Sequence, residues 1–364
     1  MGFFNNQNQV DIYKQIAEIN NPTLDLLKPH QIKNKLDEDI IGNESTKMIL
    51  STSIYNHYKK ISYSGNIEMD KSNILLLGPT GSGKTYLIKK IAKLLNIPYY
   101  IGDATVLTAS GYVGSDVESL LTGLLERANG NIQKAQIGLI VIDEIDKLGR
   151  KSENPSITRD VSGEDVQGSL LKMLEGSIVK IQPGERRQHP EKQFIDINTE
   201  NILFIGMGSF EGIENKIKKR LNLHRVGYTT QTELKSIEYD EKNILKHVNT
   251  EDLRSFGLIP ELIGRLPIIV TTEHLSEEAL VKIITEPKNA ILKQYKELFK
   301  MDGCVLSFDD AALIAVAKHA IKLKTGARSL RTILEKVLQN YMYDIPKKKT
   351  KKLNITEEIV NSLI

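Results

Sequence analysis

The sequence predicts an α/β fold built on a parallel sheet, followed by a smaller, mainly α-helical lid domain. Three strand-like apolar runs alternate with helical stretches, which is the βαβ rhythm of a parallel sheet. These runs are Ile74–Leu77, Leu139–Ile142 and Ile202–Ile205. Past residue 272, closely spaced helical patterns replace this rhythm. We therefore expect a flexible leader at residues 1–28, a large α/β domain at 29–272 and a small helical domain at 273–364.

Composition and charge narrow the class of protein. A chain of 364 residues favours more than one domain. Its 49 Lys and Arg residues nearly balance 46 Asp and Glu residues, so no overall field directs it to nucleic acid or to a membrane. No apolar run approaches the roughly 18 residues of a membrane span, and the first residues lack a signal-peptide pattern. The single Cys304 excludes an intramolecular disulfide and a cysteine-rich zinc module within this chain, so we expect no zinc and a reducing, cytoplasmic compartment.

The sequence also predicts helices and loops on both sides of the strand-like runs. Within Leu36–Ile61 a helical pattern follows Ile40-Ile41-Gly42, and a polar loop comes next at about 62–71. The five lysines between residues 347 and 352 are typical of a solvated turn. The helices expected in the small domain are Ser276–Thr285, Pro287–Lys300, Asp309–Leu323 and Ser329–Tyr343, with a short strand near Cys304–Ser307.

A glycine-rich segment after the first strand carries the clearest chemical signal. It reads GPTGSGKT and matches the G-x-x-x-x-G-K-[ST] phosphate cradle, and a helical pattern follows at Tyr86–Leu95. Glycine adopts backbone angles closed to other residues, so successive N–H groups can converge on phosphate oxygens. We expect Lys84 to reach the β- and γ-phosphates and Thr85 to ligate Mg²⁺. The candidate ATP-binding residues are Gly78, Pro79, Thr80, Gly81, Ser82, Gly83, Lys84 and Thr85.

A second buried-strand pattern ends in two carboxylates, Asp143 and Glu144. P-loop enzymes use such a pair to hold Mg²⁺ and to prime a water molecule. Any strand can end in solvated acids, but the preceding phosphate cradle favours the catalytic interpretation. We expect Asp143 to support the metal and Glu144 to act as the base, while Lys84 neutralises charge on the transferring phosphoryl group.

Two arginines stand in suggestive contexts, Arg265 in IGRLP and Arg328 in TGARS. An added arginine accelerates phosphoryl transfer in sites of this kind. By spacing alone, however, each is more typical of a surface ion pair.

The assembled motifs resemble the ClpX family of AAA+ protein unfoldases over about residues 29–359. The resemblance implies an AAA+ P-loop NTPase fold and a homo-hexameric ring that binds ATP and Mg²⁺ and hydrolyses ATP between subunits. It also implies that unfolded or tagged proteins are threaded through a central pore towards a ClpP-type peptidase, so the chain would be an ATPase and not itself a peptidase. The blocks that carry it are PHQIKNKLDEDIIGNE, YNHYKK, GPTGSGKT, GYVGSDVES, VIDEIDK, RDVSGEDVQGSLLKMLEG, FGLIPELIGRLP, EPKNAILKQYKELF and KTGARSLRTILE.

Carried over by position, the resemblance implies roles around the nucleotide. Arg265 resembles the finger that reaches the γ-phosphate of a neighbouring subunit, and Arg328 resembles the sensor of the same subunit's nucleotide. Ile40 and Ile41 would pack against adenine. A hinge near Leu266–Thr272 would convert hydrolysis into motion.

Other residues resemble the parts that handle the substrate. Tyr112 and Val113, within GYVG, resemble the first pore loop, where a flat ring grips an extended chain with little regard for sequence. By itself this stretch is also typical of a loop with a packed tyrosine. Arg159, within RDVSGE, resembles the second pore loop, although the same stretch suits a capped helix N-terminus.

The chain departs from the family pattern in several places. The four-cysteine N-terminal zinc module is absent from it, which bears on adaptor docking. The pore entrance loop, usually Arg-Lys-His, reads Arg187-Gln188-His189. The peptidase-docking tripeptide, usually Ile/Leu-Gly-Phe, reads Val226-Gly227-Tyr228, and its phenol hydroxyl would need a partner inside an apolar cleft. At the first sensor position, Ser209 is the only polar side chain.

Two other functions compete with the unfoldase interpretation. One is a nucleic-acid-handling AAA+ motor, such as a clamp loader or helicase. The balanced charge and an aromatic rather than basic pore loop argue against it. The other is a nucleotide-dependent scaffold that does not hydrolyse ATP, and the complete set of catalytic motif residues argues against that.

Overall fold

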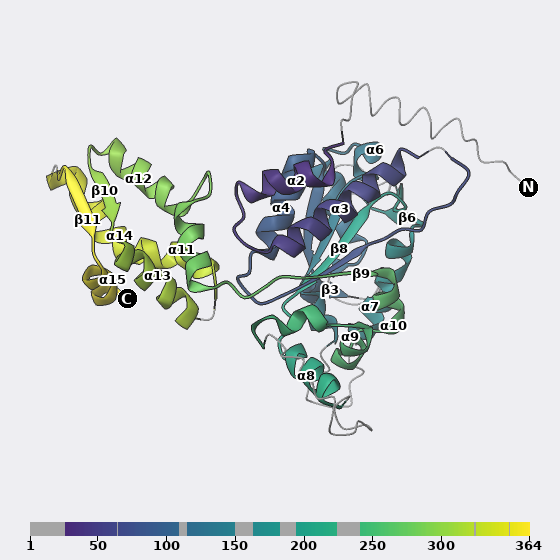
Figure 1. The fold of residues 1–364 in the computed structure, drawn as a ribbon. Coiled ribbons are helices and arrows are strands. Elements are labelled where there is room, and N and C mark those ends of the chain that lie inside the picture. Colours follow the sequence, from purple (N-terminus) through teal and green to yellow (C-terminus); the bar gives the residue numbers. More distant parts are fainter. Residues whose placement is uncertain are drawn as a thin grey trace, which may run out of the picture. The chain divides into compact units, whose positions relative to one another are not determined.

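The structure is a computed structural model that describes residues 26–63, 65–108, 115–149, 163–182, 194–223, 241–323, 325–348 and 350–364. The chain forms two compact units, which Figure 1 shows coloured along the sequence. Of the described residues, the first unit comprises those from 26 to Ile32 and those within Met48–Leu77 and Ile91–Thr271. The second unit comprises Lys33–Lys47, Gly78–Lys90 and Thr272–Ile364.

A five-stranded parallel sheet forms the core of the first unit, in the order β2-β5-β8-β1-β9. Its strands are β1 (Ile74–Leu77), β2 (Tyr99–Asp103), β5 (Leu139–Asp143), β8 (Leu203–Gly208) and β9 (Ile268–Thr271). Every residue of β1 and β8 is buried, because a parallel sheet covered on both faces needs continuous apolar runs. The three predicted strands are therefore confirmed, with β8 extending to Gly208.

Strand β9 occupies most of the segment that we expected to act as a hinge. Residues Ile268–Thr271 pair with β1 along their whole length, with Ile268 opposite Ile74 and Thr271 opposite Leu77. A strand held by a neighbour in this way does not absorb the large backbone rotations of a hinge. The expectation of a hinge over Leu266–Thr272 is therefore wrong for the residues of β9.

Helices surround the sheet of the first unit, and their buried side chains form one apolar core with those of β1, β5 and β8. They are α5 (Ser119–Arg127), α6 (Ile132–Ala135), α7 (Gly163–Glu175), α8 (Ile213–Leu223), α9 (Thr250–Phe256) and α10 (Pro260–Arg265). Two short strand pairs accompany them, β3 (Leu107–Thr108) with β4 (Ser115–Asp116) and β6 (Ile178–Ile181) with β7 (Ile195–Asn198). Among the described residues, no helix combines the length and the apolar character that crossing a membrane requires.

Three further helices are α2 (Pro29–Asp37), α3 (Glu44–Ile61) and α4 (Lys84–Leu95). The helical pattern predicted after Ile40-Ile41-Gly42 is confirmed as α3, which ends at Ile61. The preceding helix α2 was not predicted. Gly42 and Asn43, directly before α3, have φ of 73° and 55°, a left-handed backbone that cannot be part of a right-handed helix.

The second unit contains the remaining helices and a parallel pair of short strands around its own apolar core (Figure 1). They are α11 (Glu277–Thr285), α12 (Ile291–Met301), β10 (Val305–Phe308), α13 (Asp310–Lys322), α14 (Arg328–Lys348), β11 (Lys352–Ile355) and α15 (Glu357–Leu363). The four predicted helices and the short strand are confirmed with shifted ends, whereas β11 and α15 were not predicted. Of the five lysines expected in a turn, Lys347 and Lys348 belong to α14 and Lys352 begins β11.

Candidate nucleotide-binding site

The phosphate loop connects β1 to α4, and its glycines adopt positive φ angles. Gly78, Gly81 and Gly83 have φ of 154°, 77° and 91°, which other residues rarely adopt. A Cβ on Gly78 would overlap the Thr272 hydroxyl, and a Cβ on Gly81 would overlap the carbonyl oxygen of Thr325. The loop thus has the backbone that a phosphate cradle requires, and α4 begins directly after it.

Lys84 is half-buried and folds back over this loop. Its ammonium group donates hydrogen bonds to the carbonyl oxygens of Gly78 at 2.6 Å and Pro79 at 3.0 Å. A phosphate oxygen would be a stronger, charged acceptor for the same group. Thr85, the next residue, is also half-buried. The glycine backbone and these two side chains therefore fit the phosphates and the Mg²⁺ of a nucleoside triphosphate.

The acidic pair begins level with the end of β1. Across β8, Ile142 is in register with Gly206, and Leu77 is in register with Gly208. The ends of β1 and β5 therefore lie at the same carboxyl edge of the sheet, two strand spacings or about 10 Å apart. Asp143 is the last residue of β5, and the phosphate loop follows Leu77 along the chain.

Glu144 has a strained backbone that the sequence did not indicate. Its φ is 56°, in the left-handed region that non-glycine residues rarely occupy. Its N–H donates a 2.9 Å hydrogen bond to Oδ1 of Asp143, and its side chain is exposed. Such strain is uncommon and is concentrated at functional sites, so it supports a functional role for Glu144.

A third acid, Asp146, was missed at the sequence level. It is completely buried, with Oδ2 at 3.4 Å from the Ser209 hydroxyl and 3.6 Å from the Lys147 ammonium group. Its Oδ1 has no hydrogen-bond partner among the described residues. A Cβ on Gly208 would overlap this oxygen. Ser209, the polar residue noted at the first sensor position, thus faces Asp146.

The two candidate arginines belong to different units. Arg265, the last residue of α10 in the first unit, is exposed and pairs with Glu175 at the end of α7. Buried Asn73 donates hydrogen bonds to the carbonyl oxygens of Arg265 at 2.9 Å and Leu174 at 3.1 Å, which fixes the backbone beneath this ion pair. Arg328 begins α14 in the second unit, which also contains the phosphate loop, and its side chain is exposed.

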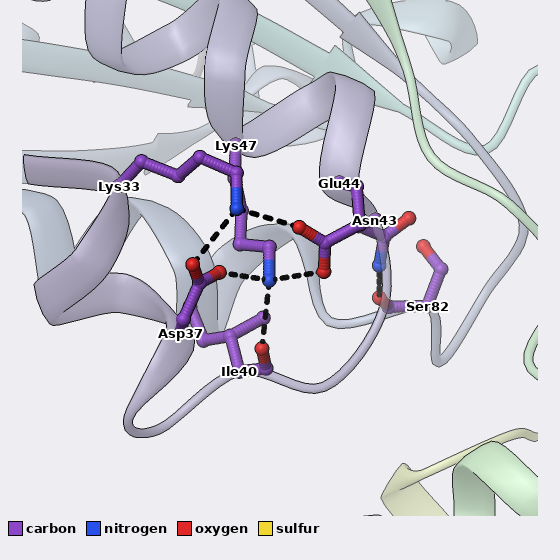
Figure 2. Close-up of polar contacts among 7 residues, drawn as sticks. All are labelled: Lys33, Asp37, Ile40, Asn43, Glu44, Lys47 and Ser82. Atoms are coloured by element: carbon purple, nitrogen blue, oxygen red, sulfur yellow. Dashed lines mark hydrogen bonds and ion pairs between the residues drawn. The ribbon is translucent and has the colours of Figure 1, made fainter. Parts of the chain in front are cut away.

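The connection between α2 and α3 carries Ile40 and Ile41 and is folded around the ammonium group of Lys47 (Figure 2). Lys47 is 1% exposed. It donates to the Ile40 carbonyl oxygen at 3.1 Å, to Oε1 of Glu44 at 2.7 Å and to Oδ1 of Asp37. One buried cation therefore sets the shape of the loop in which the two isoleucines lie, each half-buried.

A second lysine, Lys33, bridges the same two carboxylates (Figure 2). Its Nζ lies 2.8 Å from Asp37 and 2.6 Å from Glu44. Hydrogen bonds from Lys33 and then Lys47 lower the pKa of Glu44. Burial alone would raise the pKa of Asp37, but hydrogen bonds from both lysines lower it overall. The two carboxylates are thus ionised at neutral pH, and each is paired with both lysines.

The remaining candidate residues lie outside the described part of the chain. They are the pore residues Tyr112, Val113 and Arg159, the entrance residues Arg187 and His189, and the docking residues Val226, Gly227 and Tyr228.

Comparison with known proteins adds two family matches and several relatives. Residues 69–269 match the AAA domain (Cdc48 subfamily), and residues 275–359 match the C-terminal D2-small domain of ClpB protein. The chain is similar to the ATP-dependent Clp protease ATP-binding subunit ClpX of Bacteroides thetaiotaomicron, at 50% identity over 335 residues, covering 91% of this chain and 80% of the relative. The protein of the same name from Porphyromonas gingivalis is 51% identical over 332 residues, covering 90% and 80%. That from Bacteroides fragilis is 49% identical over 335 residues, covering 91% and 80%.

Proposed function

Because this chain belongs to the ClpX family of AAA proteins, we propose that it uses ATP hydrolysis to unfold proteins and thread them through the pore of a homo-hexameric ring. The chain is an ATPase and not itself a peptidase. The observation that carries the proposal is the phosphate loop, whose glycines have the required backbone and which leaves the sheet at the same edge as Asp143.

Residues 78–85 hold the triphosphate in this proposal. Thr85 and Asp143 would hold Mg²⁺, which would supply a Lewis acid at the phosphates. Lys84 exchanges its bonds to the Gly78 and Pro79 carbonyl oxygens for phosphate oxygens, and neutralises charge there. Glu144 takes a proton from the attacking water, and its exposed position after a strained turn suits a base that must reach a substrate.

Residues beyond this loop complete the nucleotide site. Ile40 and Ile41 pack against adenine, and the Lys47 cluster supports their loop from beneath. Arg265 acts on the γ-phosphate of a neighbouring subunit, and Arg328 contacts the nucleotide of its own subunit. The exposure of both arginines supports these roles, since each must reach a ligand. Motion between the two domains arises after Thr271, where β9 ends.

The substrate and the partner are assigned from the family resemblance. Tyr112 and Val113 grip the translocating chain, while Arg159, Arg187 and His189 line the route into and through the pore. Val226-Gly227-Tyr228 docks on a ClpP-type peptidase. The relatives are named ATP-binding subunits of an ATP-dependent Clp protease, which supports such a partner here.

The proposal is tested by loss of fluorescence from a stable, tagged fluorescent protein incubated with this chain, ATP and Mg²⁺. We expect ATP-dependent loss of fluorescence without any peptidase present, and none with the Glu144→Gln variant. Tyr112→Ala should keep ATP hydrolysis and lose unfolding, which separates the pore from the ATP site.

Each failure has a distinct meaning. Persistent fluorescence with continued ATP hydrolysis, for several different tags, would contradict the unfoldase role. Hydrolysis that rises on adding DNA, with salt-dependent DNA binding, would favour a nucleic-acid motor instead. No turnover at all would favour a scaffold.

A further inference from the structure

The side chain of Asn43 donates one hydrogen bond and accepts another. Its Nδ2 donates to the carbonyl oxygen of Ser82 in the phosphate loop, at 3.3 Å (Figure 2). Its Oδ1 accepts from the N–H of Glu273, at 3.0 Å. Asn43 is only 6% exposed, so water does not readily replace either bond. A carboxamide both donates and accepts, whereas a carboxylate only accepts, so the pair of bonds requires Asn rather than Asp at this position.

The backbone at Asn43 is set to make these contacts. Its φ of 55° lies in the left-handed region, which Asn tolerates better than most residues. The Asn43 carbonyl oxygen accepts from the N–H of Lys47, in the first turn of α3. The Lys47 ammonium group in turn holds the preceding loop through Ile40. Asn43 is therefore held rigidly between this cluster and the phosphate loop.

A second contact joins the phosphate loop to residues 272–273. The hydroxyl groups of Ser82 and Thr272 lie 2.7 Å apart, and the two residues are 5% and 1% exposed. The Thr272 hydroxyl also occupies the space where Gly78 would carry a Cβ. Residues 272–273 are thus tied to the phosphate loop through both the backbone and the side chain of Ser82.

We propose that Asn43 is a positioning residue of the nucleotide site, which together with the Ser82–Thr272 hydroxyl pair holds the phosphate loop against residues 272–273. Residues 272–273 directly follow β9, so Asn43 and the hydroxyl pair connect the end of this strand to the phosphate loop. ATP affinity therefore depends on contacts that touch no part of the nucleotide. This inference rests on the proposed ATP site. It adds Asn43 as a residue that holds the phosphate loop in its conformation.

The experiment measures ATP binding by calorimetry in the Glu144→Gln background, where hydrolysis does not interfere. Asn43→Gly keeps the left-handed backbone and removes both bonds. Asn43→Asp keeps the acceptor for Glu273 and places a carboxylate against the Ser82 carbonyl oxygen. Loss of a buried hydrogen bond corresponds to a factor on the order of ten, so we expect Kd for ATP to rise about tenfold in both. Thr272→Val should also raise Kd, and Thr272→Ser, which keeps a hydroxyl, should restore it.

Asn129→Gly is the matched control, because Asn129 is exposed and has the same φ of 55°. It should leave Kd unchanged. A merely structural role for Asn43 would lower the thermal midpoint without nucleotide and leave Kd unaltered. If the Asn43 variants bind ATP within twofold of their parent, the inference is wrong. If the Glu144→Gln parent itself binds no ATP, the proposed function fails instead, so the two failures are distinguishable.

Discussion

The guanidinium group of Arg265 and the carboxylate of Glu175 form an ion pair in which two nitrogens share one oxygen. Nε lies 3.0 Å and a terminal nitrogen 2.8 Å from Oε1 of Glu175. The two side chains are 52% and 46% exposed, so water screens their attraction. The pair joins the end of α10 to the end of α7.

Replacing Glu175 by Gln should therefore hardly affect stability. We expect the free energy of unfolding in urea to change by less than about 1 kcal/mol, as for other exposed pairs. Arg265→Ala should lower ATP turnover by on the order of a thousandfold while leaving the Kd for ATP unchanged, because the proposed finger stabilises charge that develops only in the transition state. A loss of several kcal/mol in Glu175→Gln would show that the pair is structural, and normal turnover in Arg265→Ala would remove its catalytic assignment.

The two lysines of the cluster beneath Ile40 should differ sharply in their effect on stability. Lys47 is 1% exposed and Lys33 is 28% exposed, although both contact Asp37 and Glu44. Lys47→Met removes the buried cation and its hydrogen bonds to Asp37, Glu44 and the Ile40 carbonyl oxygen. It should lower the free energy of unfolding by about 1–3 kcal/mol, because these bonds are lost while both carboxylates keep access to water. Lys33→Met should cost about 1 kcal/mol or less. Urea titrations of the two variants check this, and equal losses would contradict the role of burial.

Gly208 should not tolerate a side chain. Its Cβ would overlap Oδ1 of Asp146 and crowd the ring of Phe210, so Gly208→Ala should lower the free energy of unfolding by about 1–3 kcal/mol. Gly168→Ala is the matched control, since Gly168 lies inside α7 with open space around it. Alanine in a helix interior should stabilise this variant by about 0.5–1 kcal/mol. Thermal unfolding of both variants should shift in opposite directions, and a shift in the same direction would contradict the packing argument.

Acid should weaken the first unit through His57. Burial is the main reason that the pKa of His57 falls to about 4. Its hydrogen bond to the Asn201 carbonyl oxygen, at 3.0 Å, acts in the opposite direction and raises the pKa. The unfolded chain, with a His pKa near 6.5, binds the extra proton first, so stability is lost as pH falls from about 6.5 towards 4. Between pH 7 and 5 the expected loss is about 2 kcal/mol.

His57→Gln, which keeps a donor for the Asn201 carbonyl oxygen, should lose most of this pH dependence. The measurement is the free energy of unfolding at both pH values for the two proteins. An equally steep dependence in His57→Gln would assign the effect to other groups.

Sequence alone was sufficient for the features whose physical requirements are local. The central strands β1, β5 and β8 were predicted because a strand buried on both faces must be a continuous apolar run. The phosphate loop was predicted because its backbone needs glycine at fixed spacings. The edge strands β2 and β9 were not predicted, and most of their residues are only half-buried. In β9 the run Ile-Ile-Val-Thr is apolar and β-branched but only four residues long.

Tertiary structure decided the contacts between residues distant along the chain. Ser209 meets Asp146 across 63 positions, Arg265 meets Glu175 across 90, and Asn43 reaches Glu273 across 230. No local pattern encodes such pairs, because each side chain is satisfied only when folding brings its partner to it. The sequence therefore determined which residues can bind phosphate, and the fold determined which residues hold them in position.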